Sequence, residues 1–215
     1  MRRTFTLAVT AALMMGLVAS PVDAKKKKPK PVVTKYFFHG NSPIGEPDGL
    51  NGATGMEPFP SMDATEPSGS NPRSMMVISY VGGPNTACRG SFLAPVWVGD
   101  VTGRVLGEAT VAFDVVSSPT AAVNVQIFPD QVDFNCDSAI PAASLVVPLP
   151  AGPGHVEATF ENLDFEVVGK VMVQISPVLG TPYYARVLYD SADFPSSFEF
   201  SCIPPKGQTS CDPEG

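Results

Sequence analysis

The feature that most constrains the fold is an alternation of apolar and polar side chains after residue 74. In the segment RVLGEATVAFDVVS, residues 104–117, Val111, Phe113 and Val115 alternate with polar neighbours such as Thr110 and Asp114. Alternation with a period of two gives a strand one dry face and one wet face, as in antiparallel strands that cover a single core. The sequence therefore predicts an all-β protein.

The same alternation recurs along the chain, and no segment after the first 24 residues shows a helical stripe of apolar residues. The alternating apolar positions are Val123, Val125, Ile127, Val156, Ala158, Phe160, Phe165, Val167, Val171, Val173 and Ile175. Shorter candidate strands lie at residues 75–81, 92–98, 145–149, 183–189 and 198–200. About nine short strands separated by turn residues predict a two-sheet antiparallel β-sandwich of jelly-roll or Greek-key type.

The first 24 residues have the pattern of an export signal. Arg2 and Arg3 precede an apolar stretch at residues 7–19, and a cleavage pattern follows at residues 22–24. The apolar stretch is shorter than the roughly 20 residues of a spanning helix, so we expect a secreted or envelope-associated protein with no transmembrane span after cleavage. An uncleaved N-terminal anchor is the alternative.

Charge divides the mature chain into a basic leader and an acidic body. The whole chain has 14 basic and 21 acidic side chains, and removal of Arg2, Arg3 and Asp23 leaves 12 and 20, a net charge of −8. From residue 36 onward only six basic side chains oppose the 20 acidic ones, a net charge of −14. Such a body repels phosphate, so a nucleic-acid partner is not expected.

The leader carries Lys25, Lys26, Lys27, Lys28 and Lys30, together with prolines. We expect residues 25–38 to be an extended linker. It serves either as a plain spacer or as a tether to an anionic cell-envelope polymer, to which each lysine contributes about 1 kcal/mol at most.

Residues 39–73 are rich in Gly and Pro and show no apolar periodicity. We expect an irregular segment packed on the sandwich through scattered apolar side chains, including Met62. The expected order is thus a signal peptide (1–24), a linker (25–38), the irregular segment (39–73), the sandwich (74–201) and a disulfide-closed tail (202–215).

Four cysteines, Cys88, Cys136, Cys202 and Cys211, remain after the signal. An even number in an exported protein favours structural disulfides, and four cysteines allow three pairings. Cys202 and Cys211 bracket the turn-forming stretch IPPKGQTS, which favours their pairing and leaves Cys88 with Cys136.

Few residues point to chemistry. The chain has two histidines, His39 and His155, and lacks HExxH, GxSxG and Cys/His clusters. We expect a non-catalytic protein that needs no cofactor. The alternatives are a secreted hydrolase acting on glycan or ester bonds through His155 or paired loop carboxylates, and a structural protein stabilised by calcium. The candidate calcium ligands are Asp130, Asp133 and Asp137.

Trp97 is the only tryptophan and lies in the stretch FLAPVWVG, where both faces are apolar. If Val96 and Val98 face the core, Trp97 faces outward beneath residues 39–73. It then either fills a gap under that segment or, with Tyr183 or Tyr189, stacks on the sugar ring of an extracellular glycan.

Three stretches resemble known secreted proteins. FFHGNSPIGEPD and MDATEPSGSNPRSM are similar to the front end of small secreted actinobacterial-type β-sandwich proteins. ARVLYDSADFPSSFEF resembles the closing strands of bacterial pre-peptidase C-terminal-type jelly-roll modules. The resemblance implies a β-sandwich that assists or attaches something outside the cell. The sequence as a whole thus favours a binding or envelope-attachment module.

Overall fold

The structure is a computed structural model that describes residues 29–40, 60–79, 95–119, 121–129, 140–178 and 183–213. Every regular element in these ranges is a β-strand, so the prediction of an all-β fold is confirmed. None of the described residues forms a helix long and apolar enough to span a membrane. The strands are β1 (Val32–Phe38), β2 (Met62–Asp63), β3 (Arg73–Ser79), β4 (Val96–Ser117), β5 (Ala122–Pro129), β6 (Ala143–Pro148), β7 (Gly152–Pro177), β8 (Tyr183–Tyr189) and β9 (Ser197–Ile203).

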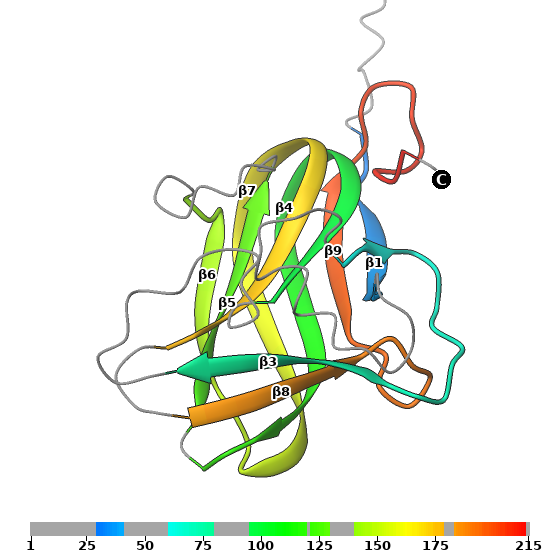
Figure 1. Cartoon of the computed structure of the whole chain (residues 1–215). Coiled ribbons are helices and arrows are strands. Elements are labelled where there is room, and N and C mark those ends of the chain that lie inside the picture. The colour runs from blue at the N-terminus through cyan, green and yellow to red at the C-terminus, as the bar shows by residue number, and fades with distance from the viewer. Residues whose placement is uncertain are drawn as a thin grey trace, which may run out of the picture.

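Two long strands, β4 with 22 residues and β7 with 26, form the centre of the fold. They pair antiparallel over the whole of β4, and the pair curls over at the upper end of Figure 1. Gly103 of β4 has a φ of 146°, and a Cβ atom there would come within 2.6 Å of the carbonyl oxygen of Ile203. Each long strand covers two of the separate strands that the alternation predicts. The backbone bends between them and does not reverse direction in a turn.

The remaining strands add to this central pair in two layers. The hydrogen-bonded order is β2-β1-β9-β4-β7-β5-β6, while β8 pairs with the end of β4 and carries β3 on its other side. β3 and β8 lie across the other strands (Figure 1), and Val77 and Val187 from these two strands join the same buried cluster as the inward side chains of β4 and β7. The predicted antiparallel sandwich of about nine strands is confirmed.

The expected linker ends earlier than residue 38. Residues 32–38 form β1, which pairs with β9 from Val32↔Cys202 to Phe37↔Ser197. Tyr36 and Phe38 from this strand are buried in the core. The lysine- and proline-rich composition of the leader hides the alternation of these few residues, which explains why the sequence alone suggests a linker here.

The expected irregular segment contributes a short strand. β2 pairs with the end of β1, and Met62 is buried, as expected of an apolar anchor from this segment. Most of residues 39–73 lies outside the described residues, including the other apolar side chains expected to pin it.

Aromatic rings from three strands meet in the core. The ring of Trp97 stacks on Phe38 with centroids 4.5 Å apart, and it meets Tyr189 edge-on at 5.2 Å. All three side chains are completely buried. Contacts of this kind stabilise the fold beyond the burial of apolar area, and here they join β1, β4 and β8.

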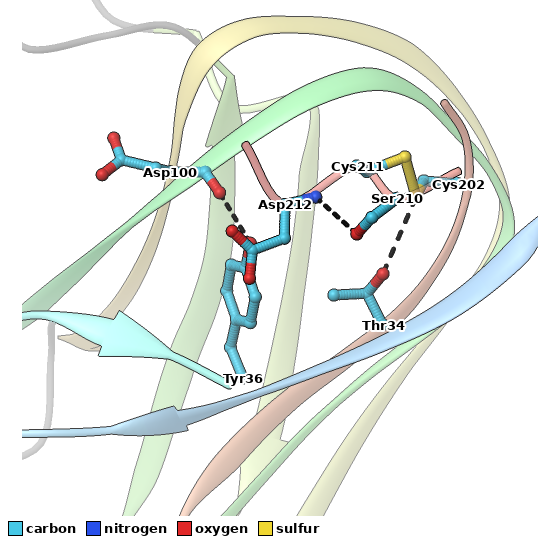
Figure 2. Close-up of a disulfide and its surroundings, with 7 residues drawn as sticks. All are labelled: Thr34, Tyr36, Asp100, Cys202, Ser210, Cys211 and Asp212. Atoms are coloured by element: carbon cyan, nitrogen blue, oxygen red, sulfur yellow. Dashed lines mark hydrogen bonds between the residues drawn. A yellow bond between two sulfur atoms is a disulfide. The ribbon is translucent and has the colours of Figure 1, made fainter. Parts of the chain in front are cut away.

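The disulfide between Cys202 and Cys211 folds the C-terminal tail back onto β4 (Figure 2). The predicted pairing of these two cysteines is confirmed, whereas Cys88 and Cys136 lie outside the described residues. The backbone N–H of Thr102 donates to the carbonyl oxygen of Cys211 at 2.8 Å. Nearby, the hydroxyl of Tyr36 donates to the carbonyl oxygen of Asp100 at 2.6 Å. The tail is thus part of the folded structure.

We expect replacement of both Cys202 and Cys211 by alanine to lower the free energy of unfolding by about 3 kcal/mol, because the bridge restrains a loop in the unfolded chain. Urea unfolding followed by circular dichroism measures this change. Thr209→Ala, an exposed position in the same loop, serves as the control and should leave the midpoint unchanged. Equal midpoints for the double variant and the wild type would contradict the expectation.

Candidate functional site

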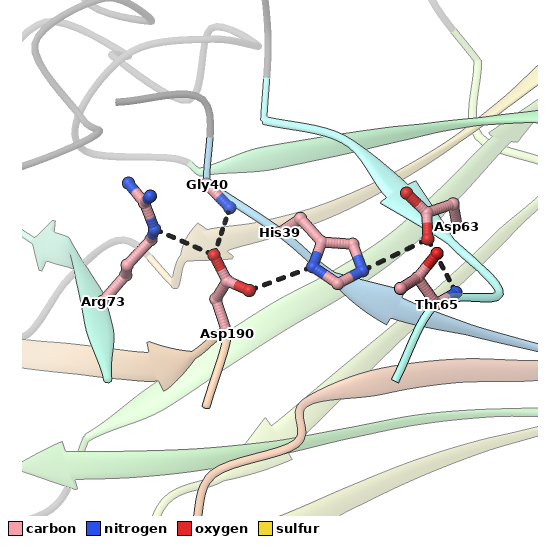
Figure 3. A network of polar contacts seen from close by, with 6 residues as sticks. All are labelled: His39, Gly40, Asp63, Thr65, Arg73 and Asp190. Atoms are coloured by element: carbon pink, nitrogen blue, oxygen red, sulfur yellow. Dashed lines mark hydrogen bonds and ion pairs between the residues drawn. The ribbon is translucent and has the colours of Figure 1, made fainter. Parts of the chain in front are cut away.

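A polar network joins the ends of four strands (Figure 3). His39 follows β1, Asp63 lies in β2, Arg73 begins β3 and Asp190 follows β8. The Nδ1 atom of His39 lies 3.0 Å from an oxygen of Asp190, and its Nε2 atom lies 3.3 Å from an oxygen of Asp63. The guanidinium of Arg73 approaches the second oxygen of Asp190 at 2.8 Å.

Asp190 is the centre of this network. It adopts a φ of 60°, which is uncommon for a residue other than glycine, and its carboxylate also accepts the backbone N–H of Gly40 at 3.0 Å. The side chains of Arg73 and Asp190 are only 12% and 18% exposed, so this ion pair is screened little by solvent. The network therefore clamps the first two strands to the β3–β8 pair. Its histidine contacts carboxylates and no described hydroxyl group.

His155, the candidate base of the hydrolase alternative, has a similar environment in a more exposed place. It lies on β7 with Nδ1 3.2 Å from Asp114 on β4 and Nε2 3.7 Å from Glu157, and its side chain is 53% exposed. Both ring nitrogens are directed at carboxylates, and no hydrogen bond joins the ring to a serine in the described ranges. The geometry is that of a polar pair on the sheet surface.

A groove of about 680 Å³ lies among the described residues. It lies between the edge strand β6 and the middle of β7. Its lining combines polar side chains with apolar ones: Ala142, Ala143, Ser144, Leu145, Thr159, Phe160, Glu161, Asn162, Leu163, Asp164 and Phe165. The lining offers both polar and apolar groups to a ligand.

A β-bulge in β7 shapes the wall of this groove. Phe160 pairs with Ala109 but Leu163 pairs with Gly107, so β7 has one residue more than β4 at this point. Asn162 in the bulge adopts a φ of 56°. Buried side chains fall on even numbers from 156 to 160 and on odd numbers from 163 to 171, because an extra residue reverses which face each position takes.

The groove is acidic. Asp164 forms a bidentate ion pair with Arg104, at 2.7 and 2.8 Å, and the hydrogen bond from Arg104 lowers the pKa of Asp164 below its ordinary value. Asp164 therefore remains ionised, and its charge is balanced by that arginine. No ion pair joins Glu161 to another described residue, and the lining includes no lysine or arginine. Glu161 supplies the uncompensated charge of the groove.

The structure corrects the ligand-stacking hypothesis for Trp97 and Tyr189. Both are 0% exposed, so neither ring is accessible to a sugar. Buried residues of β4 fall on odd numbers from Trp97 to Ser117, whereas a separate strand at residues 92–98 predicts that even positions face inward. Trp97 lies on the same face of β4 as Val101 and Val105. A strand that ends at residue 98, as the sequence predicts, does not reveal this shared face.

The other expected site residues fall mostly outside the described residues. These are the candidate calcium ligands Asp130, Asp133 and Asp137, the lysines Lys25, Lys26, Lys27 and Lys28, and the side chain of Tyr183. Lys30 is exposed, just before β1. No group of three His, Cys, Asp or Glu side chains with the geometry of a metal site occurs in the described ranges.

Comparison with known proteins places the chain near no family. No family model and no curated protein matches its sequence. Among solved structures, a CocE/NonD family hydrolase from Staphylococcus aureus is similar over 82% of this chain, with a TM-score of 0.48 and 8% identity. An α-amino acid ester hydrolase is similar over 82% of this chain, with a TM-score of 0.47 and 11% identity. A CBM4 structure is similar over 47% of this chain and 60% of its own, with a TM-score of 0.32 and 15% identity.

The chain spans 37% of the length of the first of these hydrolases and 36% of the second. At this level of similarity neither their activity nor that of the third protein transfers to this chain.

We expect Asp190→Asn to lower the free energy of unfolding by about 2 kcal/mol, because it removes a negative charge that lies 2.8 Å from the partly buried guanidinium of Arg73. Thermal unfolding at neutral pH measures the loss. Asp193→Asn, the same substitution at an exposed position nearby, is the control and should leave the melting temperature unchanged. If both variants melt together with the wild type, the network does not clamp the strands.

Proposed function

We propose that this chain is an exported, non-catalytic β-sandwich that binds an extracellular or cell-envelope polymer in the groove between β6 and β7. The observation that carries the proposal is the groove itself, about 680 Å³ in volume and lined by both polar and apolar side chains. Such a lining provides hydrogen bonds for orientation and apolar contacts for affinity.

The shape of the groove favours an extended ligand. One wall follows β7 from residue 159 to residue 165, a stretch of at most about 20 Å at the usual rise of a strand. A linear polymer that lies along this wall contacts several side chains in succession. A small compact ligand would contact only part of the lining.

The charge of the groove selects among polymers. Glu161 repels an anionic chain, so a neutral or basic polymer is the ligand that the groove accepts. The anionic envelope material expected as a partner of the leader lysines would instead meet Lys25, Lys26, Lys27, Lys28 and Lys30. The leader and the groove then have different partners.

The position of β1 limits how far the leader reaches. The sheet begins at Val32, so the expected cleavage after residue 24 leaves seven residues, 25–31, before the first strand. Seven extended residues span at most about 25 Å. A tether through these lysines would hold the sandwich close to the surface, with β1 nearest to it.

Binding through the groove can be tested by sedimentation with insoluble polymers such as chitin, cellulose and purified cell walls. We expect the mature protein to sediment with at least one of them. Leu145→Asp should reduce the bound fraction at least about tenfold, because it adds a charge to an apolar part of the lining. Val33→Asp, an exposed valine on β1, is the matched control. Equal binding by the two variants would exclude the groove as the binding site.

The tether can be tested separately by deletion of residues 25–30. We expect the deletion to weaken retention on anionic cell walls at low salt and to have no effect at high salt, because salt screens the lysine charges. A variant with these lysines replaced by glutamine controls for leader length. Equal retention of the deleted, glutamine-substituted and intact proteins at low salt would show that the leader is only a spacer.

A further inference from the structure

The groove lies between two strand edges that have no partner among the described strands. Among the described strands β6 pairs only with β5, and it lies at the margin of the sandwich (Figure 1). β5 pairs with β7 only at residues 171–177, so the part of β7 that lines the groove pairs with β4 alone. Residues 142–145 and 159–165, which line the groove, thus come from two edges with no described strand between them.

The backbone of β6 presents hydrogen-bonding groups to this space. The N–H of Leu149 donates to the carbonyl oxygen of Ala121 at 2.8 Å, in register with the pairing Ala122↔Pro148. Hydrogen-bonded pairs alternate along an antiparallel ladder. The N–H and C=O groups of Ser144 and Val146 therefore point away from β5, toward the open edge.

The side chains of β6 do not protect this edge. Natural edge strands are usually blocked by charged side chains, bulges or proline. The strand ASLVVP has no charged residue, and its only proline is the last residue. Leu145 and Val146 are 36% and 58% exposed, and Ile140 just before the strand is 80% exposed.

We propose that the groove binds an extended segment of another polypeptide, which adds to the edge of β6 as a further β-strand and carries a basic side chain opposite Glu161. Backbone hydrogen bonds to Ser144 and Val146 would hold the segment, while Leu145 and the apolar lining would contact its alternate side chains. β6 has six residues, so it pairs with a segment of about six residues, roughly 20 Å long.

Charge favours a basic partner. The only ionised side chains in the lining are Glu161 and Asp164, and Asp164 is already paired with Arg104. The net charge of −14 from residue 36 onward would also attract a basic segment at long range. A second copy of this acidic chain would be repelled. This proposal rests on the proposed function in that it uses the same groove, and it names the ligand of that groove.

The probe is a peptide selected from a random octapeptide phage library on the immobilised mature protein, with affinity measured by fluorescence anisotropy. We expect the selected peptides to alternate apolar residues with polar ones and to contain lysine or arginine. Val146→Pro should weaken binding at least about tenfold without lowering the melting temperature, because the lost N–H faces the open edge. Val146→Ala keeps that N–H and should bind within about threefold of the wild type.

Peptide N-methylation tests the backbone pairing on the wild-type protein, whether or not Val146→Pro folds. Methylation of one alternate set of peptide amides should abolish binding, and methylation of the other set should have little effect. Glu161→Gln should weaken binding of the basic peptide and reduce its dependence on salt.

Several results would overturn the strand-addition proposal: no enriched peptide, equal loss from both methylated sets, or full affinity in a folded Val146→Pro variant. If Leu145→Asp still abolishes sedimentation with a glycan polymer, the proposed function stands and only this inference fails. If neither a peptide nor any polymer depends on the groove, both fail.

Discussion

The pairing of β4 with β7 is the contact on which the other strands depend. β8 and β9 add to β4, and β5 adds to β7. β1, β3 and β6 then pair with these strands in turn. Both long strands are shared between the layers of the sandwich, so their side chains enter a single core from either end. Loss of this pairing would leave β5, β8 and β9 without the long strands that they pair with. Glycines and a bulge accommodate the bend within the pair, so both strands continue through it.

Alternation in the sequence was sufficient to predict the fold class, because it records directly which side chains are buried. It was not sufficient to predict strand lengths. The alternating sets at residues 156–160 and 165–175 fall on even and odd numbers respectively, and either a turn or a bulge explains such a change. The structure contains the bulge. In β4 the odd positions stay inward throughout, so a continuous strand would have placed Trp97 in the core from the start.

The candidate sites were predictable to a smaller extent. The disulfide joins cysteines separated by 9 residues, so local turn chemistry pointed to it. His39 and Asp190 are 151 residues apart, and the pairing of β1 with β9, the strand that follows β8, brings them together. Strand order of this kind follows from long-range packing that a single sequence does not record. The groove has the same origin, since its two walls come from β6 and β7 and its only sequence signal is the change from even to odd positions.

The edge of β7 beside the bulge has no partner among the described strands. β5 follows β7 only after residue 171, beyond the curl, so β5 and β6 diverge from the first half of β7 and a trough opens between them. An exposed uncharged edge is a risk for aggregation, and acidic side chains across the trough limit pairing with another acidic copy of the same chain. The same arrangement leaves the edge open to a segment of opposite charge. The uncharged edge of β6 and the acidic side chains across the trough are the two features on which the proposed binding of a basic segment rests.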